Sequence, residues 1–404
     1  MATVRKRTWV ANGVTKTGWS VDYVDQYGNR ERKQFTTKKF ADAYRVEIEG
    51  KLQNGIYRPD AMKVLVGEIA ESFLAHCKER KERKERMTEK MFRVYDGHIN
   101  NYICPNPDRH NGKRRPSRLV TILSPSDGLA HVKAGALTEG GVNDFRDRLR
   151  KLGVGVVTTR KILATLQCML KFAIGKDLLS INVAEDVEVI GPRDEGAKKI
   201  VPPTRRAMKA LLDIAGEFRT ELLVASSTAV RAGEYHALRW RHFNFDAAEV
   251  RIETRVDAFR EEDTTKTAAG IRVIPLGQAV IVALKERKLK SKFNKPDDLV
   301  FPNKLGEYES HDNMVKREYL PLFEELDRLH AEDSEKHIKV PYFNWHALRH
   351  FGISMWIAAK LNPKTVQTFA GHSSLQVTMD RYGHLFEDDD HKLAMDQIAQ
   401  ELAS

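Results

Sequence analysis

One tyrosine near the C-terminus lies among basic side chains, in the stretch GHSSLQVTMDRYGHL at residues 371–385. Arg381 directly precedes Tyr382, and His372 and His384 lie ten residues before it and two residues after it. A tyrosine hydroxyl can act as a nucleophile when neighbouring groups help it to lose its proton, because its ordinary pKa is about 10. The same ring could equally be a core aromatic with a hydrogen-bonded tip. This stretch alone leaves both interpretations open.

A second basic cluster lies in the stretch NWHALRH at residues 344–350. On a helix, His346 and Arg349 share one face, and His346 and His350 have the spacing of two zinc ligands. A zinc hydrolase helix of this kind needs a glutamate directly after the first histidine, and Ala347 occupies that place. Without a third ligand, and without a glycine-rich phosphate loop or paired carboxylates elsewhere, the sequence predicts no metal and no cofactor.

Two further charged positions, Arg231 and Lys266, are informative only when they are considered together with the other basic residues. Arg231 lies three residues before Glu234 in the stretch STAVRAGEYHALRW, and an exposed pair of this kind contributes less than about 1 kcal/mol. Lys266 lies in the connection between strands predicted at 250–256 and 271–274. A lysine in a turn is common, so neither position identifies a site by itself.

The composition favours a polyanionic partner. The chain has 404 residues, of which 41% are hydrophobic and 30% charged, and its formal net charge is +11. A basic balance of this size favours nucleic acid. Three cysteines without a C-x-x-C spacing fit a reducing cytoplasm. Without a long apolar run or a secretory signal, we expect a cytoplasmic protein with no membrane partner.

Three regions are expected to position these residues. Residues 1–60 predict a small sheet, with strands of alternating polarity at 19–24 and 31–35, followed by a helix at 40–48. Twelve Lys and Arg against seven Asp and Glu give this region an excess of five positive charges. A small basic sheet is typical of a DNA-groove reader.

The sequence of the remaining chain predicts one all-helical region and one region that contains both helices and strands. Residues 61–190 read as helices, with Thr138 as an N-cap and a helix at 158–174. The charges at 78–86 predict a solvated helix, because opposite charges recur three and four residues apart. A polar stretch with glycine and proline then marks a boundary, and residues 191–404 predict a mainly helical domain with a small antiparallel sheet.

Taken in chain order, the basic residues and the tyrosine resemble the catalytic set of the tyrosine recombinase (phage integrase) family. The matching positions are Arg231, Lys266, His346, Arg349, His372 and Tyr382. These motifs cover roughly residues 200–390. The helical region resembles the core-binding domain of that family, and the first region is more loosely similar to its three-stranded arm-binding domains.

The resemblance implies a metal-free cleavage of DNA. Tyr382 would attack a phosphorus atom and form a 3′-phosphotyrosine. Arg231 and Arg349 would clamp the non-bridging oxygens, a task that suits guanidinium because its planar fork matches phosphate and stays charged. Lys266 would donate a proton to the departing 5′ oxygen.

The histidines and Glu234 receive supporting roles under the same resemblance. His346 is the candidate acceptor of the tyrosine proton, His372 would hydrogen-bond the scissile phosphate, and Glu234 would orient Arg231. His350 and His384 fall outside the matching set. We expect a core hydrogen bond for His350, and a structural or phosphate-side role near the nucleophile for His384.

Three positions depart from the family pattern. Ala347 stands where an acidic residue often follows the first histidine, and Ala229 stands where glycine often precedes the first arginine by two positions. Val183 follows Asn182 where the family often has Asn-Pro. None of these departures removes a catalytic group.

The resulting hypothesis is an integrase of a phage or other mobile element, acting in the bacterial cytoplasm. It would bind double-stranded DNA at core sites and arm sites as a homotetramer, with accessory bending or excision factors. A type IB topoisomerase-like nicking-closing enzyme and a non-catalytic DNA-binding protein on a recombinase scaffold stay open as alternatives. A tail helix at 393–402, with Met395, Ile398 and Leu402 on one face, would dock on a neighbouring protomer or on its own domain.

Overall fold

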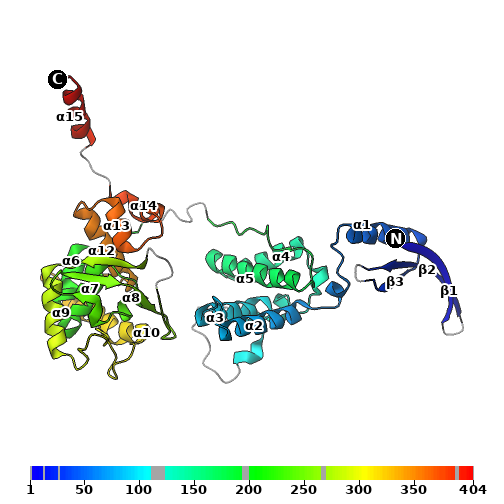
Figure 1. Ribbon diagram of the computed structural model, residues 1–404, viewed down its shortest axis with the longest axis horizontal. Coiled ribbons are helices and arrows are strands. Elements are labelled where there is room, and N and C mark those ends of the chain that lie inside the picture. Colours follow the sequence, from blue (N-terminus) through cyan, green and yellow to red (C-terminus); the bar gives the residue numbers. More distant parts are fainter. Residues whose placement is uncertain are drawn as a thin grey trace. The chain divides into compact units, whose positions relative to one another are not determined.

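The computed structural model divides the chain into two compact units, Met1–Arg193 and Asp194–Ser404, and each is considered by itself (Figure 1). The structure describes residues 2–11, 14–25, 28–110, 123–192, 200–264, 270–386 and 391–403. No helix in these ranges is long and apolar enough to cross a membrane.

The first unit begins with the predicted three-stranded antiparallel sheet. Strands β1 (Thr3–Ala11), β2 (Val14–Val24) and β3 (Arg30–Phe35) pair in that order, and helix α1 (Lys38–Gln53) follows. Val21 from the central strand is buried together with apolar residues of α1. The alternation in the sequence therefore marked the face of the sheet that the helix covers.

Four helices form the larger core of the first unit. They are α2 (Val66–Glu82), α3 (Glu89–His98), α4 (Glu139–Lys151) and α5 (Val156–Gly175). Thr138 caps α4 as predicted, because its hydroxyl accepts a hydrogen bond from the backbone N–H of Gly141 at 3.1 Å. The buried face of α5 packs at the centre of this helical core.

The charged run at 78–86 is helical only in part. Helix α2 ends at Glu82, and Lys84 and Arg86 adopt left-handed backbone angles with φ of 59° and 35°. The prediction of one solvated helix through this run was wrong. Charge spacing carries no signal for the turn into α3, at which Met87 is buried.

The described part of the second unit contains ten α-helices and five strands, and its buried apolar residues form two hydrophobic clusters. Its helices are α6 (Arg205–Ile214), α7 (Arg219–Thr228), α8 (Ala232–His236), α9 (Gln278–Lys290), α10 (His311–Met314), α11 (Leu320–Glu332), α12 (His346–Ala358), α13 (Pro363–Ala370), α14 (Leu375–Tyr382) and α15 (His391–Ala403). Its strands are β4 (Phe243–Asn244), β5 (Glu249–Ile252), β6 (Thr254–Val256), β7 (Glu262–Thr264) and β8 (Arg272–Pro275).

The predicted strand at 250–256 is broken into two. Its first half, β5, pairs with β8 in the sheet ordered β4-β5-β8, whereas its second half, β6, pairs with β7 in a separate ribbon. Helix α8 lies directly against β6, since a Cβ added to Gly233 would come within 2.5 Å of the Val256 carbonyl oxygen. The β6–β7 ribbon therefore packs against α8 and does not extend the β4-β5-β8 sheet.

Helix α12 packs against both α7 and α13, and Figure 1 shows it beside α13 and α14 at one end of the unit. The close approach to α7 depends on Gly352. A Cβ at this position would overlap the carbonyl oxygen of Ser226 and lie 2.9 Å from the Cβ of Ala229. The spacing between α7 and α12 is thus set by a residue without a side chain.

We predict that Gly352→Ala destabilises the protein by about 1–3 kcal/mol, because the added methyl group forces α12 away from α7. Urea unfolding of the full chain measures the change. Gly277→Ser is the matched control, since Gly277 has open space around its Cβ position and precedes α9 as its N-cap. The control should leave stability unchanged or slightly raised, and equal losses in both variants would contradict the close packing.

Candidate active site

Arg231 is held at its backbone and at its side chain by one carboxylate. Arg231 is the N-cap of α8, and Glu234 lies one turn later on the same helix. One carboxylate oxygen of Glu234 accepts from the Arg231 backbone N–H at 2.9 Å, and the other accepts from Nη1 of Arg231 at 2.8 Å. Glu234 is only 3% exposed, so this is not a surface ion pair.

Arg272 approaches the same carboxylate from β8. Its Nη2 and Nη1 donate to the two oxygens of Glu234 at 2.8 and 3.2 Å, and its side chain is 1% exposed. Burial alone would raise the Glu234 pKa, but the hydrogen bonds and charge of Arg272 and the charge of Arg231 lower it to about 2. Glu234 is therefore ionised at neutral pH and neutralises part of the charge of two arginines.

The sequence analysis did not identify Arg272. Its signal lies in the alternation of β8, where Arg272 and Ile274 are buried and the residue between them is exposed. A buried arginine in the inward phase of a strand requires buried hydrogen-bond acceptors, among which a carboxylate also supplies a counter-charge. That pattern indicates a partner without naming Glu234.

Arg349 is buried in α12 and donates to the ends of two other helices. Its Nη1 binds the Ala229 carbonyl oxygen and its Nη2 binds the Ala370 carbonyl oxygen, both at 2.6 Å. The carbonyl groups at a helix C-terminus carry partial negative charge, and Ala229 and Ala370 lie at the ends of α7 and α13. Burial, followed by the charge of Arg231, lowers the Arg349 pKa to about 9. Among the described residues no carboxylate forms an ion pair with Arg349, so its direct hydrogen-bond partners are carbonyl dipoles and Glu234 acts on it only from a distance.

The turn after α13 brings the two predicted phosphate-binding arginines together. Gly371 follows Ala370 directly, and its carbonyl oxygen accepts from Nη2 of Arg231 at 2.8 Å. Gly371 has a left-handed φ of 63°, and a Cβ there would come within 3.0 Å of Nη1 of Arg272. Consecutive carbonyl groups therefore anchor Arg349 and Arg231, and only glycine leaves room for Arg272.

Ala229 shows the physical basis of one departure from the family pattern. It is the C-cap of α7 and has φ 48° and ψ 31°, a left-handed conformation that costs a non-glycine residue about 1 kcal/mol or more. Glycine adopts this conformation without that cost. The alanine is nevertheless held there because its carbonyl oxygen binds Arg349.

Tyr382 ends α14 with its side chain enclosed, and the residue is 1% exposed. Its hydroxyl oxygen lies 2.6 Å from Nδ1 of His350. The ring of His372 is stacked near the tyrosine ring, with centroids 6.2 Å apart, and Nδ1 of His372 lies 2.9 Å from the Thr378 hydroxyl. The hydrogen bond expected for His350 is thus made to the predicted nucleophile.

His346 lies one turn before His350 on α12 and is exposed. The two imidazole rings meet edge to face with centroids 4.7 Å apart. Within the described part of the chain no hydrogen bond joins His346 to the tyrosine hydroxyl. Its role as proton acceptor stays a prediction without a supporting contact in this conformation.

The electrostatics of the site favour an anion. Desolvation and then the charges of Arg349 and other arginines lower the pKa of His346, and the pKa of His372 is lowered in the same way to about 3. Burial raises the Tyr382 pKa, and the charges of Arg349 and Arg381 partly oppose that rise. The imidazoles are therefore neutral at pH 7, first because they are desolvated and then because arginine charges surround them, and a bound phosphate would offset those charges.

Two further positions that the sequence singled out are Lys266 and His384. Lys266 is outside the described residues, between β7 and Gly270. Nε2 of His384 lies 3.3 Å from the Ile200 carbonyl oxygen, a contact with the start of the unit. Over the ranges that the structure describes, no group of three or more His, Cys, Asp or Glu side chains could hold a metal ion.

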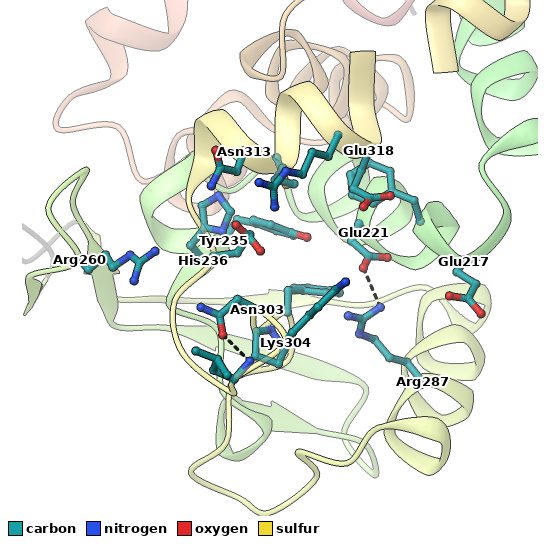
Figure 2. Close-up of a pocket in the computed structure, with 17 residues that line it drawn as sticks. Glu217, Glu221, Tyr235, His236, Arg260, Arg287, Asn303, Lys304, Asn313 and Glu318 are labelled. Carbon is teal, nitrogen blue, oxygen red and sulfur yellow. Dashed lines mark hydrogen bonds and ion pairs between the residues drawn. The ribbon is translucent and has the colours of Figure 1, made fainter. Parts of the chain in front are cut away.

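A cavity of about 580 Å³ in the second unit is a separate feature, and Figure 2 shows the side chains that line it. Its lining includes Glu221, whose carboxylate accepts from Nη1 of Arg287 at 2.7 Å, together with Tyr235 and His236. None of the predicted catalytic residues lines it. The chemistry of the site is thus not built on this cavity.

The structure places a buried tyrosine hydroxyl, a histidine and two arginines in one region of the second unit. Residues 204–388 match the phage integrase family. A tyrosine recombinase XerC-like protein of Caldanaerobacter subterraneus is 25% identical over 384 residues, which cover 89% of this chain and 90% of that protein. The ICEBs1 integrase of Bacillus subtilis is 24% identical, and the match covers 64% of this chain and 70% of the relative.

Solved structures show the same fold. The Tn1549 transposon integrase in complex with circular intermediate DNA matches with a TM-score of 0.57 and 16% identity, covering 83% of this chain and 99% of that chain. Residues 204–388 of this chain are thus similar to the phage integrase family, and most of the chain is similar to a tyrosine recombinase XerC-like protein.

We predict that Glu234→Gln costs about 3–5 kcal/mol at pH 7, because Arg272 would stay buried without its counter-charge. The Glu234 pKa is lowered from 4.5 to about 2, so its stabilisation is complete above pH 4.5 and is lost as the pH falls toward 2. The difference between wild type and variant should therefore shrink at acid pH. Urea unfolding at pH 7, 5 and 3.5 measures it.

The exposed Glu324→Gln is the matched control for this experiment, since it changes the same group on the surface of α11. It should leave stability within about 0.5 kcal/mol of wild type. A Glu234→Gln difference that does not change between pH 7 and pH 3.5 would contradict the ionised, buried carboxylate.

Proposed function

We propose that this chain is a site-specific DNA recombinase, an integrase that inserts or excises a phage or other mobile element. One observation carries the proposal. The buried hydroxyl of Tyr382 lies near enough to Arg349 for this positive charge to lower the Tyr382 pKa against the effect of burial, and among the described residues no carboxylate hydrogen-bonds to Arg349. A DNA phosphate would supply the missing negative charge beside the nucleophile.

In the proposed cleavage step, the Tyr382 oxygen bonds to phosphorus and the bond to the 5′ oxygen breaks. Arg231 and Arg349 each use two of their five N–H donors on the protein contacts that hold them. The remaining donors are available for the non-bridging oxygens, and the side chain of Arg231 is 43% exposed. Because these donors are already oriented, they stabilise the charge that develops in the transition state.

The proposed chemistry conserves the energy of the phosphodiester. The departing 5′ oxygen takes a proton, which we assign to Lys266, and the DNA stays attached through a 3′-phosphotyrosine. A 5′ hydroxyl of another strand then attacks this ester and releases the tyrosine. Since each step exchanges one phosphate ester for another, no nucleotide or metal cofactor is required.

The rest of the chain supports binding to double-stranded DNA. We propose three parts, an arm-type DNA-binding domain at 1–60, a core-binding domain at 61–190 and the catalytic domain at 191–404. Arg5 and Lys6 on β1 are exposed, which suits contacts with phosphates. The Tn1549 integrase was solved with circular intermediate DNA. By analogy, the helical core and the catalytic unit would bind the core sites, residues 1–60 would bind the arm sites, and accessory factors would bend the DNA or direct excision.

We predict that Tyr382→Phe abolishes covalent capture of DNA while DNA binding stays within about threefold of wild type, because only the nucleophilic oxygen is lost. The substrate is a nicked suicide duplex from an attachment site of the encoding element. The measurement is a denaturation-resistant protein–DNA band formed in the presence of a chelator. Tyr342→Phe is the matched control, since Tyr342 is exposed and lies outside the site.

The same duplex separates the competing functions. A non-catalytic DNA-binding protein would form no adduct on the true attachment site. A topoisomerase-like enzyme would form the adduct and relax supercoils, but would not exchange strands in an assay with two attachment sites. Exchange between two sites is the outcome that the proposed function requires.

We further propose that α15 docks on a neighbouring protomer of a tetramer assembled on DNA. Met395, Ile398 and Leu402 lie on one face of this helix and are exposed, with Leu402 at 83%. Three large apolar side chains on a helix in water favour burial against a partner. Docking on the helix's own catalytic unit is the alternative.

We predict that truncation after Asp390 weakens the assembly of protomers on DNA at least tenfold, while the melting temperature of the free protein changes little. Native gels and sedimentation of the DNA complex measure the assembly. The matched control replaces the exposed Glu401 with Gln, which keeps the apolar face intact. Unchanged assembly, or a large loss of monomer stability, would contradict docking on a neighbour.

A further inference from the structure

His350 is the described side chain that touches the oxygen expected to attack DNA. Nδ1 of His350 lies 2.6 Å from the hydroxyl oxygen of Tyr382, whereas the other two histidines of the cluster are placed differently. His372 lies beside the tyrosine ring with its Nδ1 next to the Thr378 hydroxyl, and His346 meets only the edge of His350. The contact with the reacting atom thus belongs to a residue outside the matching family set.

We infer that His350 is a catalytic residue, which orients the Tyr382 hydroxyl through Nδ1 and takes its proton as the oxygen bonds to phosphorus. This inference rests on the proposed recombinase function and names the base for its first step. The imidazole stays in place because it is half-buried on α12, one residue after the anchored Arg349.

The proton balance of the step is simple. As the bond from the Tyr382 oxygen to phosphorus forms, the hydroxyl proton moves to Nδ1 of His350, and the bond from phosphorus to the 5′ oxygen breaks. The departing oxygen takes its proton from the acid assigned to Lys266. During resealing the attacking 5′ hydroxyl loses a proton to that group, and His350 returns its proton to the released tyrosine oxygen.

The surroundings of His350 suit a base that becomes stronger when DNA binds. Burial, then His346, and then the charges of Arg349 and Arg381 lower the His350 pKa to about 4. The imidazole is therefore neutral at pH 7, and its Nδ1 can accept the hydroxyl proton. A phosphate bound by the arginines offsets the charges that oppose protonation. The base thus gains strength at the moment when the nucleophile must lose its proton.

Burial of the nucleophile supports the need for a base within the protein. Tyr382 is 1% exposed, so its hydroxyl is shielded from bulk water in this conformation. Burial also raises the Tyr382 pKa, which makes spontaneous loss of the proton rarer still. A positioned base contributes typically 10²–10⁴-fold to the rate of such a step.

The test compares His350→Ala, His350→Asn and Lys266→Ala in the full chain. Each variant is given two nicked duplexes from the attachment site, one with the ordinary 5′ oxygen and one with sulfur at that bridging position. A thiolate leaves without a proton, so sulfur removes the need for an acid but not the need for a base. The rate of covalent adduct formation is measured with the affinity for each duplex.

We expect both His350 variants to lose about 10²-fold or more in rate on both duplexes, with DNA affinity unchanged. The asparagine can still hydrogen-bond the hydroxyl but cannot accept its proton, so it separates proton transfer from orientation. If the alanine variant fails to fold, the asparagine variant decides alone. Lys266→Ala should recover on the sulfur duplex, as loss of an acid requires.

Two kinds of result would overturn the inference about His350. Variants of His350 that react at the wild-type rate or faster show that the hydrogen bond is a passive contact or a restraint on the tyrosine. Variants that recover on the sulfur duplex show that the loss concerns the leaving group. If wild-type protein forms no adduct on either duplex, the proposed function itself fails.

Discussion

The buried carboxylate of Glu234 is the interaction on which the site depends. It joins Arg231 at the start of α8 to Arg272 in β8, and Arg272 also donates to the Phe369 carbonyl oxygen at 2.7 Å. One negative charge thereby connects a helix, a strand and the end of α13. Removing it would leave a buried guanidinium without its counter-charge, which is among the costlier single changes in a protein.

The charge balance around this carboxylate explains why the site suits a phosphate. Glu234 carries one negative charge, and Arg231 and Arg272 carry two positive charges between them. Arg349 adds a third positive charge, whose direct hydrogen-bond partners within the described residues are carbonyl groups. An excess of positive charge in a partly buried site raises the free energy of the free protein, and a bound anion lowers that free energy again.

The tyrosine side of the site depends on one helix surface. Helix α12 presents His346, Arg349 and His350 toward the same region, and its distance from α7 is set by the absence of a side chain at Gly352. Arg349 then anchors to α7 and α13, while His350 reaches the hydroxyl at the end of α14. A small displacement of α12 would therefore disturb the proposed phosphate contact of Arg349 and the proposed nucleophile Tyr382 together.

The sequence by itself predicted several of the helices and strands and most of the candidate catalytic residues. Local pattern and residue type predicted the strands β2 and β3 of the first unit and the Thr138 cap, because these depend on neighbours within a few residues, whereas β1 was expected only from the family resemblance. Residue types and their order predicted Arg231, Arg349 and Tyr382 as members of one set, and the structure brings these described members into one region of the second unit.

Only the tertiary structure decided which groups meet. Arg231 binds Gly371 across 140 residues, and Arg349 binds Ala229 across 120, distances over which no periodic pattern carries information. For the same reason the sequence did not predict the burial of Glu234 or the role of Arg272. A glutamate three residues after an arginine has the same sequence pattern whether the pair lies on the surface or in the core. The tertiary structure also placed His350 rather than His346 on the tyrosine hydroxyl, because the docking of α14 against α12 selects between two histidines one helical turn apart.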